Sequence, residues 1–213
     1  EAGILEDPWR EPPEDAYVMT KGLDKVPTKP RYIEIDFEEG VPVKLNGKAK
    51  GLVAMIEELN EIAGSYGVGR FDQIENRLVG IKSREVYEAP AAHVLLKAHE
   101  ELENMVMDRE FLHYKKVLTE KYAEMVYFGL WFSPLKDALD QFFKSNQKRV
   151  TGKIRIKLDR GHVIMAGRRS PFSLYSEKLA TYSEGDTFDH RSAEGFMKIW
   201  GLPYEGLGTA SKK

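Results

Sequence analysis

One stretch of the sequence, residues 70–87, carries side chains of the right types to bind a small charged molecule. Its charged and polar members include Arg70, Asp72, Glu75, Asn76, Arg77, Lys82, Ser83, Arg84, Glu85 and Tyr87. A carboxylate can hold an ammonium group and an arginine can fork onto a carboxylate, so this set suits a small zwitterion. The apolar residues Ile74, Leu78, Val79 and Ile81 are interleaved with it, which favours a partly buried polar network. A purely structural, ion-paired loop is the other interpretation that the residues leave open.

Nucleotide chemistry would need a phosphate-binding loop, normally a glycine-rich turn that follows a strand and opens a helix. The glycine cluster of this chain, Gly64, Gly67 and Gly69, follows a predicted helix instead. No Lys-Ser/Thr pair completes a P-loop there, so we interpret the cluster as a helix end and a loop. We therefore expect no cofactor-binding residues in this segment.

Histidines and a row of basic residues complete the candidate chemistry. His93 and His99 are six residues apart and project to different faces of a helix, whereas metal pairs on helices are three or four residues apart. We therefore predict no metal site and interpret the five histidines as surface or core residues. The basic row on one predicted strand consists of Lys153, Arg155, Lys157 and Arg160. A solvated outer strand face explains this row better than nucleic-acid binding does.

The elements that position these residues follow from hydrophobic periodicity. Period-two alternation predicts two hairpins, one within 31–45 and one within 153–166. Helical spacing predicts helices between them, within 52–63, 95–105, 111–125 and 135–143. Asp108 is a candidate N-cap, and Ser133-Pro134 reads as an N-cap with a first-turn proline. Residues 65–90, which include the candidate segment, show no clear periodicity.

These elements predict an α+β fold in which two β-hairpin regions flank a helical block. Five prolines within the first 30 residues predict an extended connector that wraps over a surface. A short apolar helix is expected around Phe196 and Trp200, bounded by Gly201 and Pro203. The predicted division is a main domain of residues 1–186 followed by a C-terminal helical arm of residues 187–213.

Composition narrows the function classes. Lys and Arg number 32 against 34 Asp and Glu, for a net charge of -2, which argues against a general binder of nucleic acids or anionic membranes. With no cysteine, the chain has no disulfide, thiolate metal site or cysteine nucleophile. No stretch is apolar enough for a membrane span, and we expect a cytoplasmic protein. The chain begins at Glu1 and reads like the back part of a longer protein.

Residues 67–92, GVGRFDQIENRLVGIKSREVYEAPAA, resemble the signature segment of the argininosuccinate synthase family. Further strings follow in the order of that family: EAGILEDP (1–8), GVPVKLNG (40–47), MDRE (107–110), YAEMVYFGLWFSPL (122–135), VTGKIRIKL (150–158) and GRRSPFSLYSEKLATY (167–182). The resemblance covers nearly the whole chain.

The resemblance implies a ligase that condenses citrulline with aspartate at the expense of ATP. It implies a citrullyl-adenylate intermediate, the release of pyrophosphate and AMP, and a role in arginine biosynthesis. The family has an N-terminal nucleotide-binding domain, expected to bind ATP and Mg²⁺, followed by a synthetase and multimerisation domain. This chain matches only the second part, so the ATP loop, the aspartate-binding residues and two serines that contact citrulline have no counterpart here.

Two citrulline contacts of the family do have counterparts, because Glu75 and Tyr87 match the motif. The resemblance implies that both bind citrulline, while Arg77, Lys82, Ser83 and Arg84 keep structural support as their default role. It also implies a homotetramer with a C-terminal segment that reaches across to neighbouring subunits. Catalytic residues are expected outside this segment, which alone would be inactive. The alternatives are a non-catalytic oligomerisation module in which loop 70–87 is purely structural and, more weakly, another adenylate-forming ligase.

Overall fold

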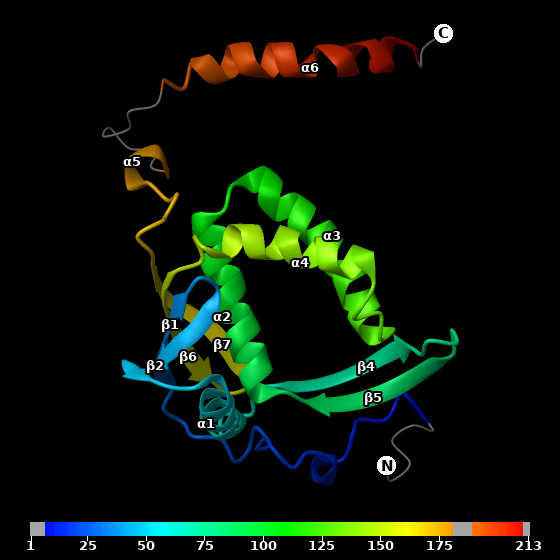
Figure 1. Ribbon diagram of the computed structural model, residues 1–213, viewed down its shortest axis with the longest axis vertical. Coiled ribbons are helices and arrows are strands. Elements are labelled where there is room, and N and C mark those ends of the chain that lie inside the picture. The colour runs from blue at the N-terminus through cyan, green and yellow to red at the C-terminus, as the bar shows by residue number, and fades with distance from the viewer. Residues whose placement is uncertain (1–6, 181–188, 211–213) are drawn as a thin grey trace. The chain divides into compact units, whose positions relative to one another are not determined.

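A five-stranded antiparallel sheet organises the first part of the computed structural model, which describes residues 7–180 and 189–210 (Figure 1). The strand order is β3-β2-β1-β6-β7. The strands are β1 (Arg31–Glu38), β2 (Val41–Leu45), β3 (Lys48–Ala49), β6 (Gly152–Asp159) and β7 (His162–Arg169). The two hairpins predicted from sequence are confirmed, and they are neighbours in a single sheet because β1 pairs with β6.

The sheet has one buried face and one charged face. Ile33 and Ile35 are fully buried and lie opposite Ile156 and Ile154, which are buried as well. Glu34 points to the other face, where it pairs with Lys153 and Arg155 at 3.2 and 2.6 Å. Part of the predicted basic row is therefore neutralised by an acidic neighbour on β1, in line with its interpretation as an outer strand face.

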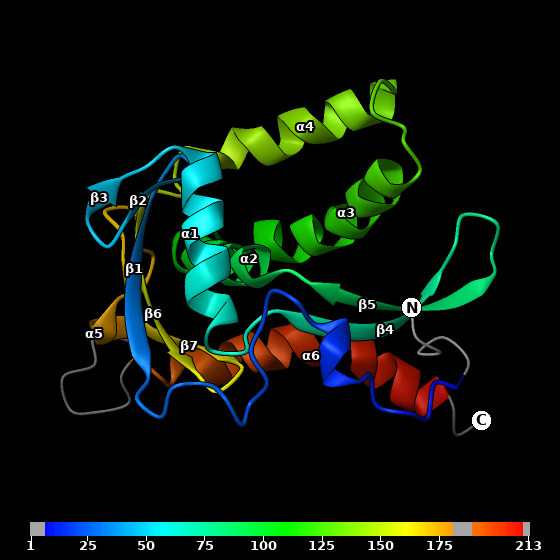
Figure 2. The ribbon, with the colours of Figure 1, turned by 90° about the horizontal axis from the view of Figure 1, so that it is seen from below.

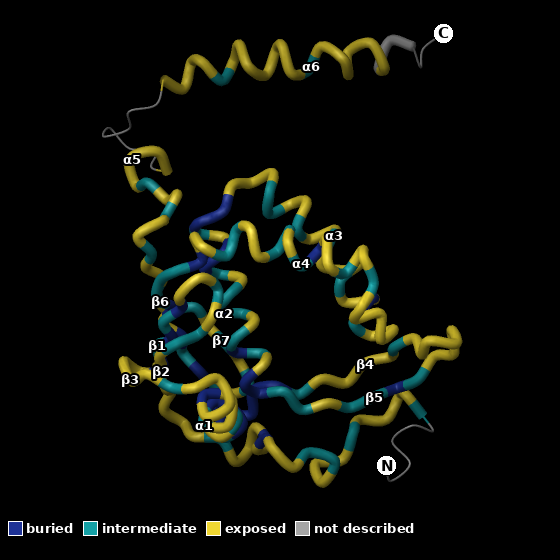
Figure 3. Tube along the Cα trace, viewed as in Figure 1, coloured by how far each residue is buried: buried dark blue, intermediate teal, exposed yellow. Residues whose placement is uncertain are grey.

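Two helices cover the buried face of the sheet. They are α1 (Leu52–Gly64) and α2 (Pro90–Val106), and both confirm predicted helices. α2 packs against α1, β6 and β7, while α1 also reaches β2. Their inward stripes bury Leu59, Ala98 and Leu102 completely. Figure 3 shows the buried residues gathered along the sheet and these two helices.

A second helical pair follows, formed by α3 (Arg109–Tyr127) and α4 (Pro134–Gln147). Both predicted N-caps are confirmed: Asp108 accepts from the Phe111 amide at 3.0 Å, and Ser133 accepts from the Lys136 amide at 3.3 Å. The rings of Phe111 and Phe142 stack with centroids 5.0 Å apart. The apolar stripes predicted for these helices thus face one another.

A third hairpin lies where the sequence shows no periodicity. β4 (Arg70–Asn76) pairs with β5 (Lys82–Glu88), and together they form a separate two-stranded sheet. The sequence shows no alternation of apolar and polar residues here because neither face of the hairpin is continuously apolar. Alternation identifies a strand only when one face is buried. Ile74, Leu78, Val79 and Ile81 are 54–75% exposed, so the partly buried polar network expected for this segment does not rest on these four side chains.

Residues 7–30 form the expected extended connector, interrupted by one short 3₁₀ helix, η1 (Glu14–Ala16). Figures 1 and 2 show the connector running alongside β4 and β5. A Cβ atom on Gly64 would lie 2.3 Å from the Met19 carbonyl oxygen, and one on Gly69 would lie 2.5 Å from the Pro90 backbone. The glycine cluster therefore ends α1 and permits close backbone packing.

The chain divides into two units, residues 1–174 and 175–213. The second contains α5 (Glu177–Ala180) and α6 (Ser192–Ala210). The domain boundary predicted after residue 186 lies outside the described residues. α6 continues through Gly201 and Pro203, so the predicted end of this helix at those residues is wrong. A proline removes one backbone donor, which by itself kinks a helix without always ending it. Among the described helices, none is long and apolar enough to cross a membrane.

Candidate functional site

The hairpin of β4 and β5 carries the predicted site residues on one of its two faces. Side chains alternate along a strand, and paired residues of antiparallel strands share a face. The register pairs Phe71 with Tyr87 and Glu75 with Ser83. The front face accordingly consists of Phe71, Gln73, Glu75, Ser83, Glu85 and Tyr87. The rear face includes Arg70, Asp72, Arg84 and Glu88.

The structure brings Glu75 and Tyr87 into direct contact on the front face. The Tyr87 hydroxyl donates a hydrogen bond to Glu75 Oε2 at 3.0 Å, and the Gln73 amide donates to the same oxygen at 3.2 Å. Within the described parts of the chain, Glu75 Oε1 accepts no hydrogen bond. The Tyr87 side chain is 43% exposed. The pair therefore offers a carboxylate oxygen and a phenol to a ligand that approaches from solvent.

The Tyr87 phenol has a raised pKa. Burial, followed by the hydrogen bond to Glu75 and the charge of that carboxylate, raises the pKa of Tyr87 above its ordinary value of 10.0. The hydroxyl group is protonated at neutral pH, as an ordinary phenol is, and it can donate a hydrogen bond. A carboxylate beside such a donor can accept charged hydrogen bonds from an ammonium or a ureido N–H group.

The rest of the front face is polar, with one aromatic contact at its base. The Phe71 ring packs against His93 with centroids 5.4 Å apart. Burial and the charge of Lys97 lower the pKa of His93, so its imidazole is neutral at pH 7. The hydroxyl of Ser83 is buried and has no hydrogen-bond partner among the described residues. Because this hydroxyl oxygen is buried, it is not itself a contact for a ligand that approaches from solvent.

Arg84 lies on the rear face, away from the Glu75–Tyr87 pair. Its side chain is 5% exposed and forks onto Asp72, with Nε–Oδ1 and Nη2–Oδ2 distances of 2.8 and 2.6 Å. The same guanidinium donates to the carbonyl oxygens of Asp7 and Arg10 at 3.1 and 2.8 Å. The hydrogen bond from Arg84 lowers the pKa of Asp72. Arg84 thus joins both strands of the hairpin to the connector.

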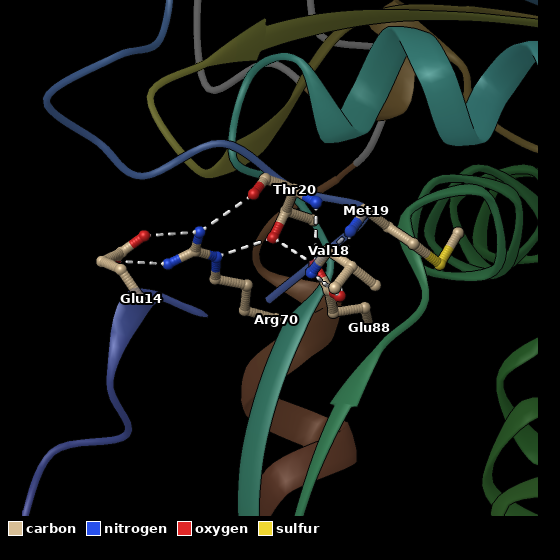
Figure 4. A network of polar contacts seen from close by, with 6 residues as sticks. All are labelled: Glu14, Val18, Met19, Thr20, Arg70 and Glu88. Carbon is tan, nitrogen blue, oxygen red and sulfur yellow. Dashed lines mark hydrogen bonds and ion pairs between the residues drawn. The ribbon is translucent and has the colours of Figure 1, made fainter. Parts of the chain in front are cut away.

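A second polar network binds the connector at the base of the hairpin (Figure 4). The Glu88 carboxylate accepts hydrogen bonds from the backbone amides of Val18, Met19 and Thr20 at 2.6–3.1 Å. The Thr20 hydroxyl also donates to it, at 2.6 Å. Burial alone would raise the pKa of Glu88, but these four donors together lower it. Sequence reasoning does not single out Glu88, since its partners lie 68–70 residues earlier in the chain.

Arg70 completes this network on the neighbouring strand. Its guanidinium forks onto Glu14 with distances of 2.8 and 3.0 Å, and it donates to the hydroxyl and the carbonyl of Thr20. It also lies 3.9 Å from the centre of the Tyr17 ring, a cation–π contact. The hydrogen bond from Arg70 lowers the pKa of Glu14. Three rear-face side chains therefore hold one continuous stretch of the connector.

The remaining candidates have structural partners. His99 Nε2 lies 2.9 Å from the Gln147 side-chain oxygen, and its Nδ1 lies 3.7 Å from the buried carboxylate of Glu103. Across the residues that the structure describes, no cluster of three His, Asp or Glu side chains is arranged to hold a metal ion. The front face of the hairpin is the strongest candidate for ligand binding.

Comparisons with known proteins match this chain from end to end. The family model described as the arginosuccinate synthase C-terminal domain matches residues 1–206. The argininosuccinate synthases of Geobacillus thermodenitrificans and Bacillus subtilis are 61% and 55% identical over 213 residues, and that of Dictyoglomus turgidum is 61% identical over 202 residues. These alignments cover 100%, 100% and 95% of this chain but 52%, 53% and 50% of the relatives. The chain spans about half the length of the curated relatives it matches.

Proposed function

Because this chain belongs to the argininosuccinate synthase family and corresponds to its C-terminal part, we propose that it forms the citrulline side of a ligase active site. The full-length enzyme condenses citrulline and aspartate in an ATP-dependent reaction. The single observation that carries this assignment is the 3.0 Å hydrogen bond between Tyr87 and Glu75. It joins the two residues that match the family's citrulline contacts.

The proposed reaction has two group transfers. The ureido oxygen of citrulline attacks the α-phosphorus of ATP, an O–P bond forms, and pyrophosphate leaves. The amine of aspartate then attacks the ureido carbon of the citrullyl-adenylate, the C–O bond breaks, and AMP leaves. In both steps the role of Glu75 and Tyr87 is to position citrulline, since correct placement of the reacting groups lowers the barrier. We assign no catalytic residue to this segment.

ATP, with Mg²⁺, is assigned to the N-terminal domain of the full-length enzyme. Two features of this chain support the assignment of the ATP site to the other domain. The glycines that could have formed a phosphate-binding loop instead pack against the connector and the start of α2. Within the described residues, no acidic or histidine cluster fits a metal ion. The isolated segment is therefore expected to be inactive and to need its nucleotide-binding partner domain.

Assembly into a cytoplasmic homotetramer is proposed for the second unit. The described side chains of α6 as far as Leu207 are exposed, apart from Ala193 and Gly201. Among the exposed ones, Phe196 and Trp200 stack with ring centroids 5.5 Å apart. An apolar helix without a buried face gains stability only when another surface covers it. A second copy of the chain is the proposed cover.

The decisive experiment is steady-state kinetics of the full-length enzyme with Glu75→Gln. The substitution keeps the shape of the side chain but removes the charge that holds citrulline. We expect the KM for citrulline to rise at least about tenfold, the effect of losing one charge-assisted hydrogen bond. The KM for ATP should change by less than about twofold, because uniform effects on both substrates indicate general damage. Equal increases in the two KM values would contradict the assignment of Glu75.

A non-catalytic oligomerisation module is the second candidate, favoured by the exposed apolar surface of α6. Calorimetry with citrulline and sedimentation of the full-length protein separate the two. Loss of citrulline binding in Glu75→Gln and Tyr87→Phe proteins that remain tetrameric supports the ligase assignment. Unchanged citrulline binding combined with broken assembly would support the second candidate.

A further inference from the structure

The hairpin that carries Glu75 and Tyr87 has little support from the rest of the fold. Among the residues that the structure describes, its two strands pair only with each other, and an isolated two-stranded hairpin is marginally stable in water. Glu75 lies next to the tip of this hairpin, in a strand whose residues are mostly exposed. Some other contact must therefore fix the distance between Glu75 and Tyr87, the two residues proposed to bind citrulline.

That contact comes from residues 7–20, which we call the strap. Arg84 binds the strap through the carbonyls of Asp7 and Arg10, and Glu88 binds it through the amides of residues 18–20. Arg70 adds the ion pair with Glu14 between these two points. The strap is thus tied along the rear face at both ends and in the middle.

The geometry links each tie to the front face. Glu88 directly follows Tyr87 on β5, so fixing the Glu88 carboxylate also fixes the backbone that aims the Tyr87 ring. Arg84 reaches across the hairpin to Asp72, which locks β5 against β4, the strand of Glu75. Lysine cannot replace this guanidinium, because a single ammonium cannot fork onto a carboxylate and also meet two carbonyls in fixed directions.

We propose that Arg84 and Glu88 are positioning residues for citrulline, and that docking of the strap on the rear face sets the Glu75–Tyr87 geometry on the front face. This inference rests on the proposed function. Since coupling between two sites is reciprocal, citrulline must in turn tighten the strap. No contact between citrulline and the strap is required, because the hairpin itself transmits the coupling.

The test uses the full-length enzyme with Arg84→Lys and Glu88→Gln, compared with Arg155→Lys. Arg155 is the control, since two of its guanidinium N–H groups also donate to a strand carboxylate, at one oxygen of Glu34, but its side chain is exposed and belongs to the five-stranded sheet. For the two rear-face variants, we expect the KM for citrulline to rise at least about tenfold, which lies within the usual range of coupling between two sites. The KM for ATP and the values for Arg155→Lys should stay within about twofold of the wild type.

Amide hydrogen exchange of residues 18–20 distinguishes the proposed coupling from a purely structural role. If the role is purely structural, citrulline leaves the exchange rates of these amides unchanged. Citrulline should slow the exchange of these amides in the wild-type enzyme, and much less in Arg84→Lys. Faster exchange in Arg84→Lys with an unchanged citrulline KM would overturn the proposal. If Arg84→Lys does not fold, Glu88→Gln decides, because glutamine keeps the shape of the side chain while losing its charge.

The outcome with Glu75→Gln distinguishes this proposal from the function on which it rests. If Glu75→Gln raises the citrulline KM and both rear-face variants leave it unchanged, only the coupling is wrong. If Glu75→Gln leaves the citrulline KM unchanged, the assignment of the front face itself is wrong.

Discussion

Tyr87 and Glu88 are consecutive residues of β5 that serve opposite faces of the hairpin. The Tyr87 hydroxyl reaches Glu75 on the front face, while the Glu88 carboxylate accepts the backbone amides of residues 18–20 on the rear face. One peptide bond thus connects the proposed substrate contact to the anchor of the strap. The predictions below follow from this arrangement and from the packing around it.

Replacing Tyr87 with phenylalanine removes the front-face hydroxyl and keeps the ring. We expect citrulline to bind about tenfold more weakly to the full-length enzyme, as for the loss of one hydrogen bond. Because the side chain is partly exposed, the free energy of unfolding should change by less than about 1 kcal/mol. Titration calorimetry and urea unfolding measure the two quantities. Unaltered citrulline affinity would remove Tyr87 from the site.

The contribution of Glu88 to stability should depend on pH. Its folded-state pKa lies below the ordinary value of 4.5, so the stabilisation is present above the unfolded-state pKa. It is lost as the pH falls through the folded-state pKa, where the carboxylate becomes protonated. The difference in unfolding free energy between wild type and Glu88→Gln should therefore be larger at about pH 7 than below about pH 4.

Urea unfolding at a series of pH values measures this difference. Glu11→Gln is the control, since Glu11 is an exposed carboxylate of the same strap and should give a small difference at every pH. A gap between wild type and Glu88→Gln that stays constant through the acid range would show that the Glu88 charge does not hold the strap.

Lys115 neutralises a buried carboxylate in the helical part of the fold. The Glu103 side chain is 4% exposed, lies 3.0 Å from Lys115 Nζ, and accepts from the Gln147 amide at 3.2 Å. Lys115→Met should destabilise the protein by about 3 kcal/mol, because it leaves a buried charge without its partner. The neighbouring Lys116 is exposed, and Lys116→Met should cost less than about 0.5 kcal/mol. Chemical denaturation measures the unfolding free energies. Similar losses of unfolding free energy for the two variants would show that Lys115 does not neutralise the Glu103 carboxylate.

Gly64 allows the strap to approach the end of α1. A Cβ atom there would lie 2.3 Å from the Met19 carbonyl oxygen, so Gly64→Ala must displace the strap or the helix end. We expect a loss of about 1–3 kcal/mol, typical of overpacking at a closely packed site. Gly51→Ala is the control, because nothing lies within 4 Å of a Cβ atom at Gly51. Gly51 is the N-cap of α1, and its replacement should cost only about 0.5 kcal/mol, because alanine is a poorer N-cap than glycine. Thermal unfolding of the two variants checks the comparison.

How far the sequence predicts the fold depends on whether an element has one buried face. The strand around Ile33 and Ile35 and the helix around Leu102 were predictable, because each alternates apolar and polar residues with its own period. The hairpin of β4 and β5 was not, because Ile74 and its apolar neighbours at the tip are exposed and both faces are polar. Its order comes from partners far away in the chain, which no local pattern encodes.

The candidate site divides in a similar way. Glu75 and Tyr87 were named through the family resemblance, and the structure places them in hydrogen-bonding contact. The roles of Arg84 and Glu88 were out of reach, since their partners in the strap lie 68–77 residues earlier. A charged residue in a sequence does not reveal whether it meets solvent or the carbonyls of a distant segment.

The alternation along the hairpin has a consequence for mutational tolerance. Residues that anchor the strap alternate along each strand with residues that face the proposed ligand. A substitution on one face therefore leaves the side chains of the other face unchanged. Gln73 and Ser83 can therefore vary, by natural drift or in a randomised library, without disturbing any of the three rear-face ties. Ligand preference can therefore evolve on the front face of the hairpin while the rear-face contacts with the strap keep its backbone in place.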